Sequence, residues 1–574
     1  MAEGVRTPCG QQNRREERTD HDDVPEVAPV PTGSAPPPTR GTDVLVVGAG
    51  PVGLAMALDL RYRGIDHLVV ERRDGRIPQP GVSTIGPRSM ELFRRWGLAD
   101  DIRAAGWPPD HPLDIAWVTR VGGHELHRFE RGSVATRPEF RHTPEPDQVC
   151  PAHWLQPLLV GAVGRAPDGP LLLSHRLDSF TQDDDGVTAH VTDLGTGTAS
   201  VVRARYLVAC DGASSPVRRW CGIDAPARHE ARVLRNILFR APELTRHLRE
   251  RGHRPAMVYF LMLSNELRYP LRSMDGGELF NLTVSGPALT ADPTALLRDA
   301  IAFDTPVEPV ADDEWHLTHW VAERYRHGRV FLAGDAAHTV SPSGGFGMNI
   351  GIADAADLGW KLAAHLRGWG GEHLLDSYEA ERRPVALDSL EAANRHLQRT
   401  LARALPVDLR ADTPEGERRR AEMAERLRAS GADKEFDNPE VHFGYRYRSP
   451  LVIGTGAELT PEWRPGSDPG SRAAHAWLRP GVSLLDVFGE GFVLLCFGHD
   501  PRGTREVREA FDARGVPLRV VECGDPELAR LYACPFVLVR PDGHVAWRDE
   551  RLPADPVRLV DAVRGSVLAA VPSG

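Results

Sequence analysis

The chain has 574 residues and a formal net charge of −11, with 41% hydrophobic and 26% charged residues. That length is too great for one hydrophobic core, so we expect two or three domains. The net negative charge and the lack of a long run of lysine and arginine residues argue against nucleic-acid binding. The seven cysteines form no Cys-x-x-Cys pair and no metal-ligand spacing, so we expect a reducing compartment and no metal site. Neither a signal peptide nor a membrane span is evident, and we expect a cytoplasmic protein.

The first 40 residues differ in composition from the rest of the chain. They are rich in proline and charged residues, with three consecutive prolines at 36–38 and almost no large apolar side chains. Such a segment buries too little apolar surface to offset the entropy lost on ordering. We therefore expect residues 1–40 to form a disordered tail.

A strand, turn, helix and second strand are predicted directly after the tail. Asp43–Val47 is an apolar run, residues 52–62 have helical spacing, and residues 68–70 are a second apolar run. The Gly-x-Gly-x-x-Gly turn at 48–53 can hold a pyrophosphate with its backbone and the helix N-terminus. Glu71 ends the second strand, where its carboxylate can accept hydrogen bonds from a ribose diol. The candidate dinucleotide-binding residues are Gly48, Gly50, Pro51, Val52, Gly53, Glu71 and Arg72.

Two later motifs distinguish FAD from NAD as the dinucleotide. The apolar run 206–210 leads into Asp211-Gly212, and the run 331–333 leads into Gly334-Asp335. A glycine-rich segment at 342–351 follows and opens a helix. In their order and in their positions at strand ends, these motifs resemble those of the para-hydroxybenzoate-hydroxylase-like flavoprotein monooxygenases.

This resemblance implies FAD as the cofactor. Asp335 would bind a ribityl hydroxyl, and backbone amides at 344–349 would hold the pyrimidine edge of the isoalloxazine ring. Arg88 matches a family position near the flavin. The chain departs from the family at Ala152, where glutamine is usual, and at Phe346, where glutamine or lysine is frequent. The further candidate cofactor-binding residues are Arg88, Asp211, Gly334, Asp335, Pro342, Gly344, Gly347, Met348 and Asn349.

Extended runs at 233–239, 257–262 and 279–284 predict a separate antiparallel sheet in the middle of the chain. We expect this sheet to bind the substrate. Six of its side chains are expected to form a broad apolar wall: Phe239, Met257, Tyr259, Met262, Met274 and Phe280. No catalytic residue stands out, and four polar residues of the region are expected to be structural or exposed: Tyr259, Tyr269, His253 and Arg268.

The last hundred residues predict a third domain. A strand at 492–497, a helix at 504–514 and a strand at 517–521 are followed by a further helix and a hairpin turn at 541–543. This order resembles the thioredoxin fold, but Cys496 has no partner at Cys-x-x-Cys spacing. We therefore expect a structural or dimer-contacting domain, and a homodimer is one expectation that follows.

Together these elements predict an α/β FAD-binding Rossmann-like domain with an inserted antiparallel β-sheet substrate domain and a C-terminal thioredoxin-like α/β domain. The expected boundaries are a tail at 1–40, the FAD-binding domain at 41–225 and 319–400, the substrate-binding sheet domain at 226–318, a helical region and linker at 401–477, and the thioredoxin-like domain without Cys-x-x-Cys at 478–574.

The span from 42 to 574 also resembles the phenol-hydroxylase branch of these flavoproteins. Segments at 111–120 and 235–242 are most similar to tetracenomycin-type aromatic polyketide hydroxylases of antibiotic-producing bacteria. This resemblance implies an enzyme that uses FAD, NADPH (or NADH) and O2 to hydroxylate a polycyclic aromatic polyketide through a flavin hydroperoxide. Three alternatives stay open: a hydroxylase of simple phenols in aromatic catabolism, a flavoprotein reductase or dehydrogenase that makes no oxygenated product, and a noncatalytic FAD-binding sensor.

Overall fold

The computed structural model describes residues 39–77, 81, 84–164, 169–264, 269–402, 405–454 and 463–567. The expected tail at 1–40 lies outside the described residues except for Thr39 and Arg40, which begin the first strand. In the described part of the chain, no helix combines the length and apolar composition needed to cross a membrane.

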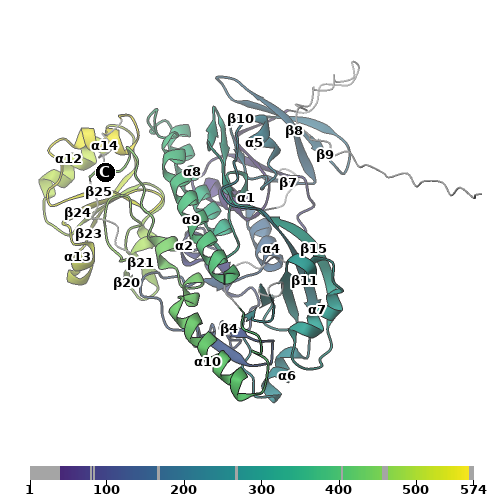
Figure 1. Cartoon of the computed structure of the whole chain (residues 1–574). Coiled ribbons are helices and arrows are strands. Elements are labelled where there is room, and N and C mark those ends of the chain that lie inside the picture. The colour runs from purple at the N-terminus through teal and green to yellow at the C-terminus, as the bar shows by residue number, and fades with distance from the viewer. Residues whose placement is uncertain are drawn as a thin grey trace, which may run out of the picture. The chain divides into compact units, whose positions relative to one another are not determined.

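An eight-stranded sheet with a parallel centre carries the nucleotide-binding motifs (Figure 1). Its strands are β1 (Thr39–Val47), β2 (His67–Glu71), β7 (Leu171–Leu173), β8 (His175–Gln182), β9 (Val187–Asp193), β10 (Ala199–Ala209), β17 (Arg326–His327) and β18 (Val330–Leu332). The order is β17-β18-β10-β1-β2-β7, and β9 pairs with β10 and with β8. Strand β1 runs parallel to both β10 and β2. The central strands are almost uniformly apolar because both faces of a parallel sheet are covered.

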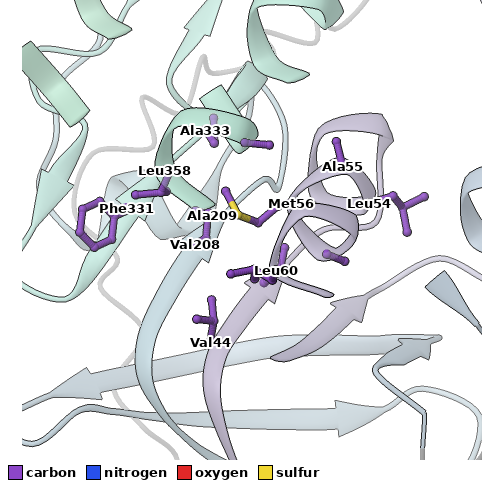
Figure 2. Close-up of a cluster of buried hydrophobic side chains, with 14 of the residues drawn as sticks. Val44, Leu54, Ala55, Met56, Leu60, Val208, Ala209, Phe331, Ala333 and Leu358 are labelled. Atoms are coloured by element: carbon purple, nitrogen blue, oxygen red, sulfur yellow. The ribbon is translucent and has the colours of Figure 1, made fainter. Parts of the chain in front are cut away.

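Three helices cover this sheet: α1 (Pro51–Tyr62), α4 (Ala152–Val163) and α8 (Phe346–Leu366). Figure 2 shows that side chains of β1, α1, β10 and α8 meet in one buried cluster, which includes Met56, Val208 and Leu358. Helices α1 and α8 approach closely at Gly351, where a Cβ would lie 2.5 Å from Val52 Cγ2. The helix that begins at the glycine-rich segment is therefore held directly against the helix of the first motif.

A second sheet has seven strands in the order β15-β11-β14-β13-β12-β4-β5. They are β4 (Ile115–Val118), β5 (Glu125–Phe129), β11 (Arg232–Arg240), β12 (Val258–Leu261), β13 (Pro270–Ser273), β14 (Leu279–Val284) and β15 (Glu308–Leu317). The three extended runs became β11, β12 and β14. The predicted sheet region at 226–318 was too narrow, because β4 and β5 come from a part assigned to the FAD-binding domain. The sheet is also not wholly antiparallel, since β4 and β12 run parallel.

The third large sheet lies near the C-terminus, in the order β23-β22-β24-β25. Its strands are β22 (Phe492–Cys496), β23 (Leu518–Glu522), β24 (Phe536–Val539) and β25 (Val545–Asp549), and its helices are α12 (Pro501–Asp512), α13 (Pro526–Tyr532) and α14 (Pro556–Val563). Strands β22 and β23 are parallel, and the other pairs are antiparallel. Trp360 of α8 contacts Phe492 of β22 with ring centroids 6.1 Å apart. The sheet therefore shares a hydrophobic cluster with α8.

The other helices include the long α9 (Ser377–Leu401), which lies beside α8 (Figure 1). The others are α2 (Pro87–Arg95), α3 (Ala99–Arg103), α5 (Pro216–Trp220), α6 (Leu244–Glu250), α7 (Pro293–Ala300), α10 (Pro414–Ala429) and α11 (Pro439–Phe443). Short strand pairs are β3 (Thr84–Ile85) with β6 (Gln148–Val149), β16 (Trp320–Val321) with β19 (His338–Thr339), and β20 (Trp477–Arg479) with β21 (Val482–Ser483).

Candidate functional site

The glycine-rich turn between β1 and α1 leaves open space beside its second glycine. Gly48 has a φ of +102°, and a Cβ there would overlap the Cys210 carbonyl oxygen. A Cβ on Gly53 would overlap the Gly48 carbonyl oxygen, so both positions require glycine for the turn to close. A Cβ on Gly50 would meet no atom within 4 Å. Helix α1 begins at Pro51 without a side-chain cap, which leaves its first amides available to an anionic group.

Two side chains hold the Ala49 peptide inside this turn. Glu71 accepts the Ala49 amide through Oε2 at 2.7 Å. Gln156 of α4 donates from Nε2 to the Ala49 carbonyl oxygen at 2.6 Å, and its buried Oε1 has no partner among the described residues. Gln156 belongs to none of the motifs predicted to bind the dinucleotide. A signal existed, because Gln156 lies one helical turn after Ala152, the position where the family usually has glutamine.

The two aspartate motifs follow the paired strands β10 and β18. Asp211 accepts the Val217 amide through Oδ2 at 3.2 Å, and its buried Oδ1 has no partner in the described part of the chain. Burial raises the pKa of this carboxyl. Gly334 has a φ of +59° and donates its amide to the buried Asp354 carboxylate at 3.1 Å. Asp335 is exposed, and its carboxylate makes no hydrogen bond or ion pair with a described residue. It is therefore available to a ligand.

The start of α8 is built from glycines that precede it and from one asparagine within it. Gly344 and Gly345 have φ values of +89° and +66°, and no side chain caps the helix. Asn349 donates to the Gly345 carbonyl oxygen at 2.6 Å and accepts the Gly86 amide at 2.7 Å. Phe346 is buried against other rings, including the imidazole of His442 at 5.9 Å between centroids. Gly347 and Met348 lie in the first turn, beside the free amides.

A cavity of about 530 Å³ lies between the start of α8 and the seven-stranded sheet. On the α8 side it is lined by Pro342, Gly344, Gly345 and Asn349. Aromatic and aliphatic side chains form much of the remaining wall: Phe129, Phe140, Val149, Met257, Val258, Phe436 and Phe443. This combination of aromatic and aliphatic side chains with polar groups suits an aromatic ligand placed beside the candidate cofactor-binding residues.

The cavity also contains polar side chains that sequence reasoning missed. Asp147 pairs with Arg131 at 2.9 Å; burial would raise the pKa of its carboxyl, but Arg131 and Arg137 outweigh this effect and lower it. Burial lowers the pKa of His442 to about 4, so its imidazole is neutral near pH 7. Arg272 of β13 is half-buried at the cavity wall and makes no hydrogen bond or ion pair with a described residue. These residues carry no local motif, because they come from separate segments.

The expected apolar wall differs from the one in the structure. Of the six residues proposed for it, only Met257 lines the cavity. Phe239, Tyr259 and Phe280 belong to a separate core cluster of the sheet, and the Tyr259 hydroxyl accepts the Ala256 amide at 2.8 Å. Alternation along a strand sends neighbouring side chains to opposite faces, which the sequence pattern alone did not resolve here. Met262 and Met274 are buried elsewhere, and neither Tyr269 nor His253 lines the cavity. Arg268 lies outside the described residues.

Arg88 also differs from the expectation of a position near the flavin. Its guanidinium donates to Glu91 at 3.0 Å and to the Asp542 carbonyl oxygen at 2.6 Å. It is buried and does not line the cavity. Arg88 is therefore part of a contact between α2 and the C-terminal hairpin. Arg72 is exposed just beyond Glu71 and has no bonded partner in the described ranges.

The residues present fit FAD. Gly50 offers space beside the free amides of α1, and the oxygens of Gln156 and Asp211 that lack partners are buried in the same region. Asp335 provides an unpaired carboxylate, and the start of α8 provides further free amides. Hydrogen-bond groups that stay unpaired in a buried site are costly unless a ligand satisfies them.

Comparisons with known proteins agree with this geometry. The FAD binding domain family model matches residues 41–393, and the model for the C-terminal region of aromatic-ring hydroxylases matches residues 467–567. Tetracenomycin B2 monooxygenase-dioxygenase of Streptomyces olivaceus is 34% identical over 567 residues, which cover 92% of this chain and 98% of that protein.

Solved structures with this fold include enzymes with bound flavin and bound ligands. RebC with bound 7-carboxy-K252c is 59% identical, with a TM-score of 0.89 and coverage of 93% of this chain and 100% of that chain. The rebeccamycin biosynthetic enzyme RebC with reduced flavin is 60% identical, with the same TM-score and 92% and 100% coverage. The flavin-dependent monooxygenase PieE in complex with FAD and substrate is 30% identical, with a TM-score of 0.81 and 92% and 100% coverage.

Proposed function

The chain belongs to the family of FAD-dependent aromatic-ring hydroxylases, and from this premise we propose that its substrate is a carboxylated polycyclic aromatic compound of the 7-carboxy-K252c type. A role in antibiotic biosynthesis goes with this proposal, since relatives of the chain are antibiotic-pathway hydroxylases.

The main support for the proposal is the position of Arg272. Its guanidinium lies at the wall of a cavity that combines aromatic and aliphatic side chains with charged ones such as Arg131 and Asp147, and it has no ion-pair partner in the described part of the chain. Burial lowers the pKa of Arg272, and the nearby Glu435 opposes that effect. The cost of burying an unpaired cation is offset most when a bound ligand brings an anionic group to it. A carboxylate on a flat ring system supplies both the charge and the apolar surface.

The chain's residues supply orientation and shelter from water. The turn at 48–53 and the amides of α1 would hold the pyrophosphate of FAD, Glu71 a ribose and Asp335 a ribityl hydroxyl. The start of α8 would hold the pyrimidine edge of the flavin. When bound, FAD supplies the redox chemistry by which NADPH or NADH and O2 hydroxylate the substrate. The ring of the substrate would lie in the cavity beside the start of α8, where the neutral His442 can accept a hydrogen bond.

A second candidate substrate class is the aromatic polyketides predicted from the sequence. Support comes from relatives such as tetracenomycin B2 monooxygenase-dioxygenase and aklavinone 12-hydroxylase RdmE of Streptomyces purpurascens. We rank the carboxylated class first because identity to RebC is 59–60%, against 34% for both of these relatives.

We also propose the fold of the C-terminal domain and the set of residues that bind the cofactor. The order of strands β22 to β25 and their helices supports a thioredoxin-like C-terminal domain at 478–574. We propose that the fourteen candidate cofactor-binding residues other than Arg72 and Arg88 contact FAD, and a homodimer stays a prediction.

The test supplies the FAD-loaded protein with NADPH and air, and compares 7-carboxy-K252c, K252c and aklavinone. We expect 7-carboxy-K252c to stimulate NADPH oxidation most strongly and to yield a product that carries one atom from ¹⁸O-labelled O2. Faster and better coupled turnover of aklavinone would contradict the carboxylated class and favour the polyketide class. NADPH oxidation without label in any product would contradict hydroxylation of all three compounds.

A further inference from the structure

A buried group of charged side chains joins α8, α9 and the C-terminal hairpin between β24 and β25. Arg540, at the end of β24, donates two hydrogen bonds to the Glu381 carboxylate of α9, at 2.5 and 2.8 Å. The same guanidinium reaches Asp357 of α8 at 3.1 Å and Asp542 of the hairpin at 2.6 Å. The side chains of all four residues are at most 2% exposed.

Lys361 completes the group from α8. Its ammonium donates to Asp357 at 2.7 Å and to Glu381 at 2.6 Å, and it is fully buried. Three carboxyl groups thus face two cations, and Glu381 and Asp542 are the two whose pKa values the cations lower. Without Arg540 the Glu381 and Asp542 carboxylates would face Lys361 alone, which would leave excess negative charge in a region of low polarity.

The same two helices hold the flavin-binding loops. Asp354 of α8, one turn before Asp357, accepts the Gly334 amide of the second aspartate motif. Arg382 of α9, next to Glu381, donates to Asp354 at 2.7 Å and to the Ile350 carbonyl oxygen at 2.9 Å. Arg382 therefore connects the Gly334 loop to the first turns of α8.

An aromatic contact gives the hairpin a second route to the same loop. Arg382 donates to the Tyr447 hydroxyl at 3.1 Å. The Tyr447 ring lies 4.2 Å from the His544 ring of the hairpin, measured between centroids, and the Arg540 guanidinium lies 5.0 Å from the Tyr447 ring. The path from Arg540 to Gly334 is thus made of consecutive buried contacts.

We propose that Arg540 is a positioning residue for the flavin: through Glu381 and Asp357 it holds α9 and α8, and these helices hold the Gly334-Asp335 loop and the glycine-rich start of α8. The C-terminal sheet would then serve the FAD site by supplying this arginine from outside the nucleotide-binding domain. This role does not depend on which substrate the enzyme uses.

The test compares three full-length holoenzymes with wild type. R540M removes the charge but keeps a long apolar stem, and R540K keeps the charge but loses the paired hydrogen bonds. R514M is the matched control, because Arg514 pairs with Asp561 of α14 at 2.7 Å and makes no hydrogen bond or ion pair with the described residues of α8 or α9. The measurements are FAD release on serial dilution, followed by FAD fluorescence, and the visible spectrum and reduction potential of the bound flavin.

We expect R540M to release FAD at a concentration about 10-fold higher than wild type, within the ~5- to 150-fold range typical of coupling between two sites. Its flavin spectrum or potential should shift. R540K should fall between R540M and wild type, and R514M should match wild type in every flavin measurement even if its thermal stability decreases.

A purely structural role of Arg540 predicts a different result. If R540M and R540K lose thermal stability but keep the FAD affinity, spectrum and potential of wild type, the proposal is wrong. If R540M does not accumulate as a folded protein, R540K alone decides: a wild-type flavin in R540K overturns the proposal, and weaker FAD binding supports it.

Discussion

Gly334 donates its backbone amide to Asp354, a carboxylate twenty positions later in the chain, while Asp335 beside it has no bonded partner among the described residues. The two aspartates therefore have different roles. Asp354 is fully buried and also pairs with His338 at 2.8 Å and with Arg382 at 2.7 Å. Asp354 fixes the conformation of the loop, and Asp335 keeps an unpaired carboxylate, which we propose binds the cofactor.

Asp335→Ala should weaken FAD binding without unfolding the protein. The lost hydrogen bond to a ribityl hydroxyl should cost about 1–3 kcal/mol of FAD binding free energy. Fluorescence titration of released FAD measures this loss, and circular dichroism checks the fold. Asp354→Asn is the control. It should lower the free energy of unfolding, because the buried Arg382 would lose the carboxylate with which it pairs. Equal thermal destabilisation by both variants would show that Asp335 is structural.

Gly50→Val should abolish FAD binding in a chain that still folds. Apart from the neighbouring residues, no described residue would have an atom within 4 Å of the new Cβ, so the side chain would fill the space proposed for the pyrophosphate. Gly53→Val should instead disrupt the turn, because its Cβ overlaps the Gly48 carbonyl oxygen. Absorbance of the bound flavin and a thermal melt separate the two effects. A yellow, FAD-loaded Gly50→Val protein would overturn the assignment of the turn.

Arg272→Gln should raise the KM for 7-carboxy-K252c by roughly 10- to 100-fold, because a hydrogen bond to a charged group is worth about 1.5–3 kcal/mol. Its kcat should change much less, since the interaction is the same in the ground state and the transition state. K252c serves as the control, because it lacks the carboxyl group named in the other compound. Parallel loss of affinity for both compounds would mean that Arg272 shapes the cavity without binding an anion.

Cys496, Cys523 and Cys534 should each be replaceable by alanine with turnover largely kept. All three are free thiols, and burial raises the pKa of Cys496 to about 11 and raises that of the other two. Thiols held in the protonated form are poor nucleophiles. The measurement is kcat/KM of the FAD-loaded single variants. A large decrease in a folded variant would indicate a redox role for the C-terminal sheet.

The contribution of Asp357 to the stability of the protein should decrease as the pH rises from about 4 towards 8. Burial raises the pKa of this carboxyl from 3.8 to about 8, with Lys361 and Arg540 opposing the shift and Glu381 adding to it. Above pH 4 the folded state therefore keeps a proton on Asp357 that the unfolded chain has released. The free energy of unfolding that this proton contributes is lost as the pH rises through the pKa of the folded state. Thermal melts of the FAD-saturated protein between pH 5 and 9 measure the slope. The stability difference between wild type and Asp357→Asn should shift against wild type as the pH rises over this range, and a difference that is independent of pH would contradict the assignment.

The nucleotide-binding elements could be predicted from the sequence because their signals are local. The turn at 48–53 and the motifs at Asp211 and Gly334 each follow a short apolar strand, so spacing alone placed them at one edge of a sheet. The family matches confirm the predicted FAD-dependent aromatic hydroxylase.

Arg88 shows where local patterns fail. Its motif position suggested the flavin, but the carbonyl oxygen that binds it belongs to Asp542, 454 residues later. Arg272 and His442 likewise reach the cavity from segments that have no motif. Only the three-dimensional arrangement brings such residues together.

The position of Arg540 late in the chain has a consequence for synthesis. Glu381 and Arg540 are separated by 159 residues, so the nucleotide-binding domain is translated long before its buried carboxylates meet their second cation. Contacts over such sequence distances also form late in folding, because chain closure costs entropy first. A nascent or truncated chain that ends before Arg540 would leave the buried carboxyl groups of α8 and α9 without the hydrogen bonds that Arg540 donates. Stable assembly of this region should therefore mark chains that have been completed.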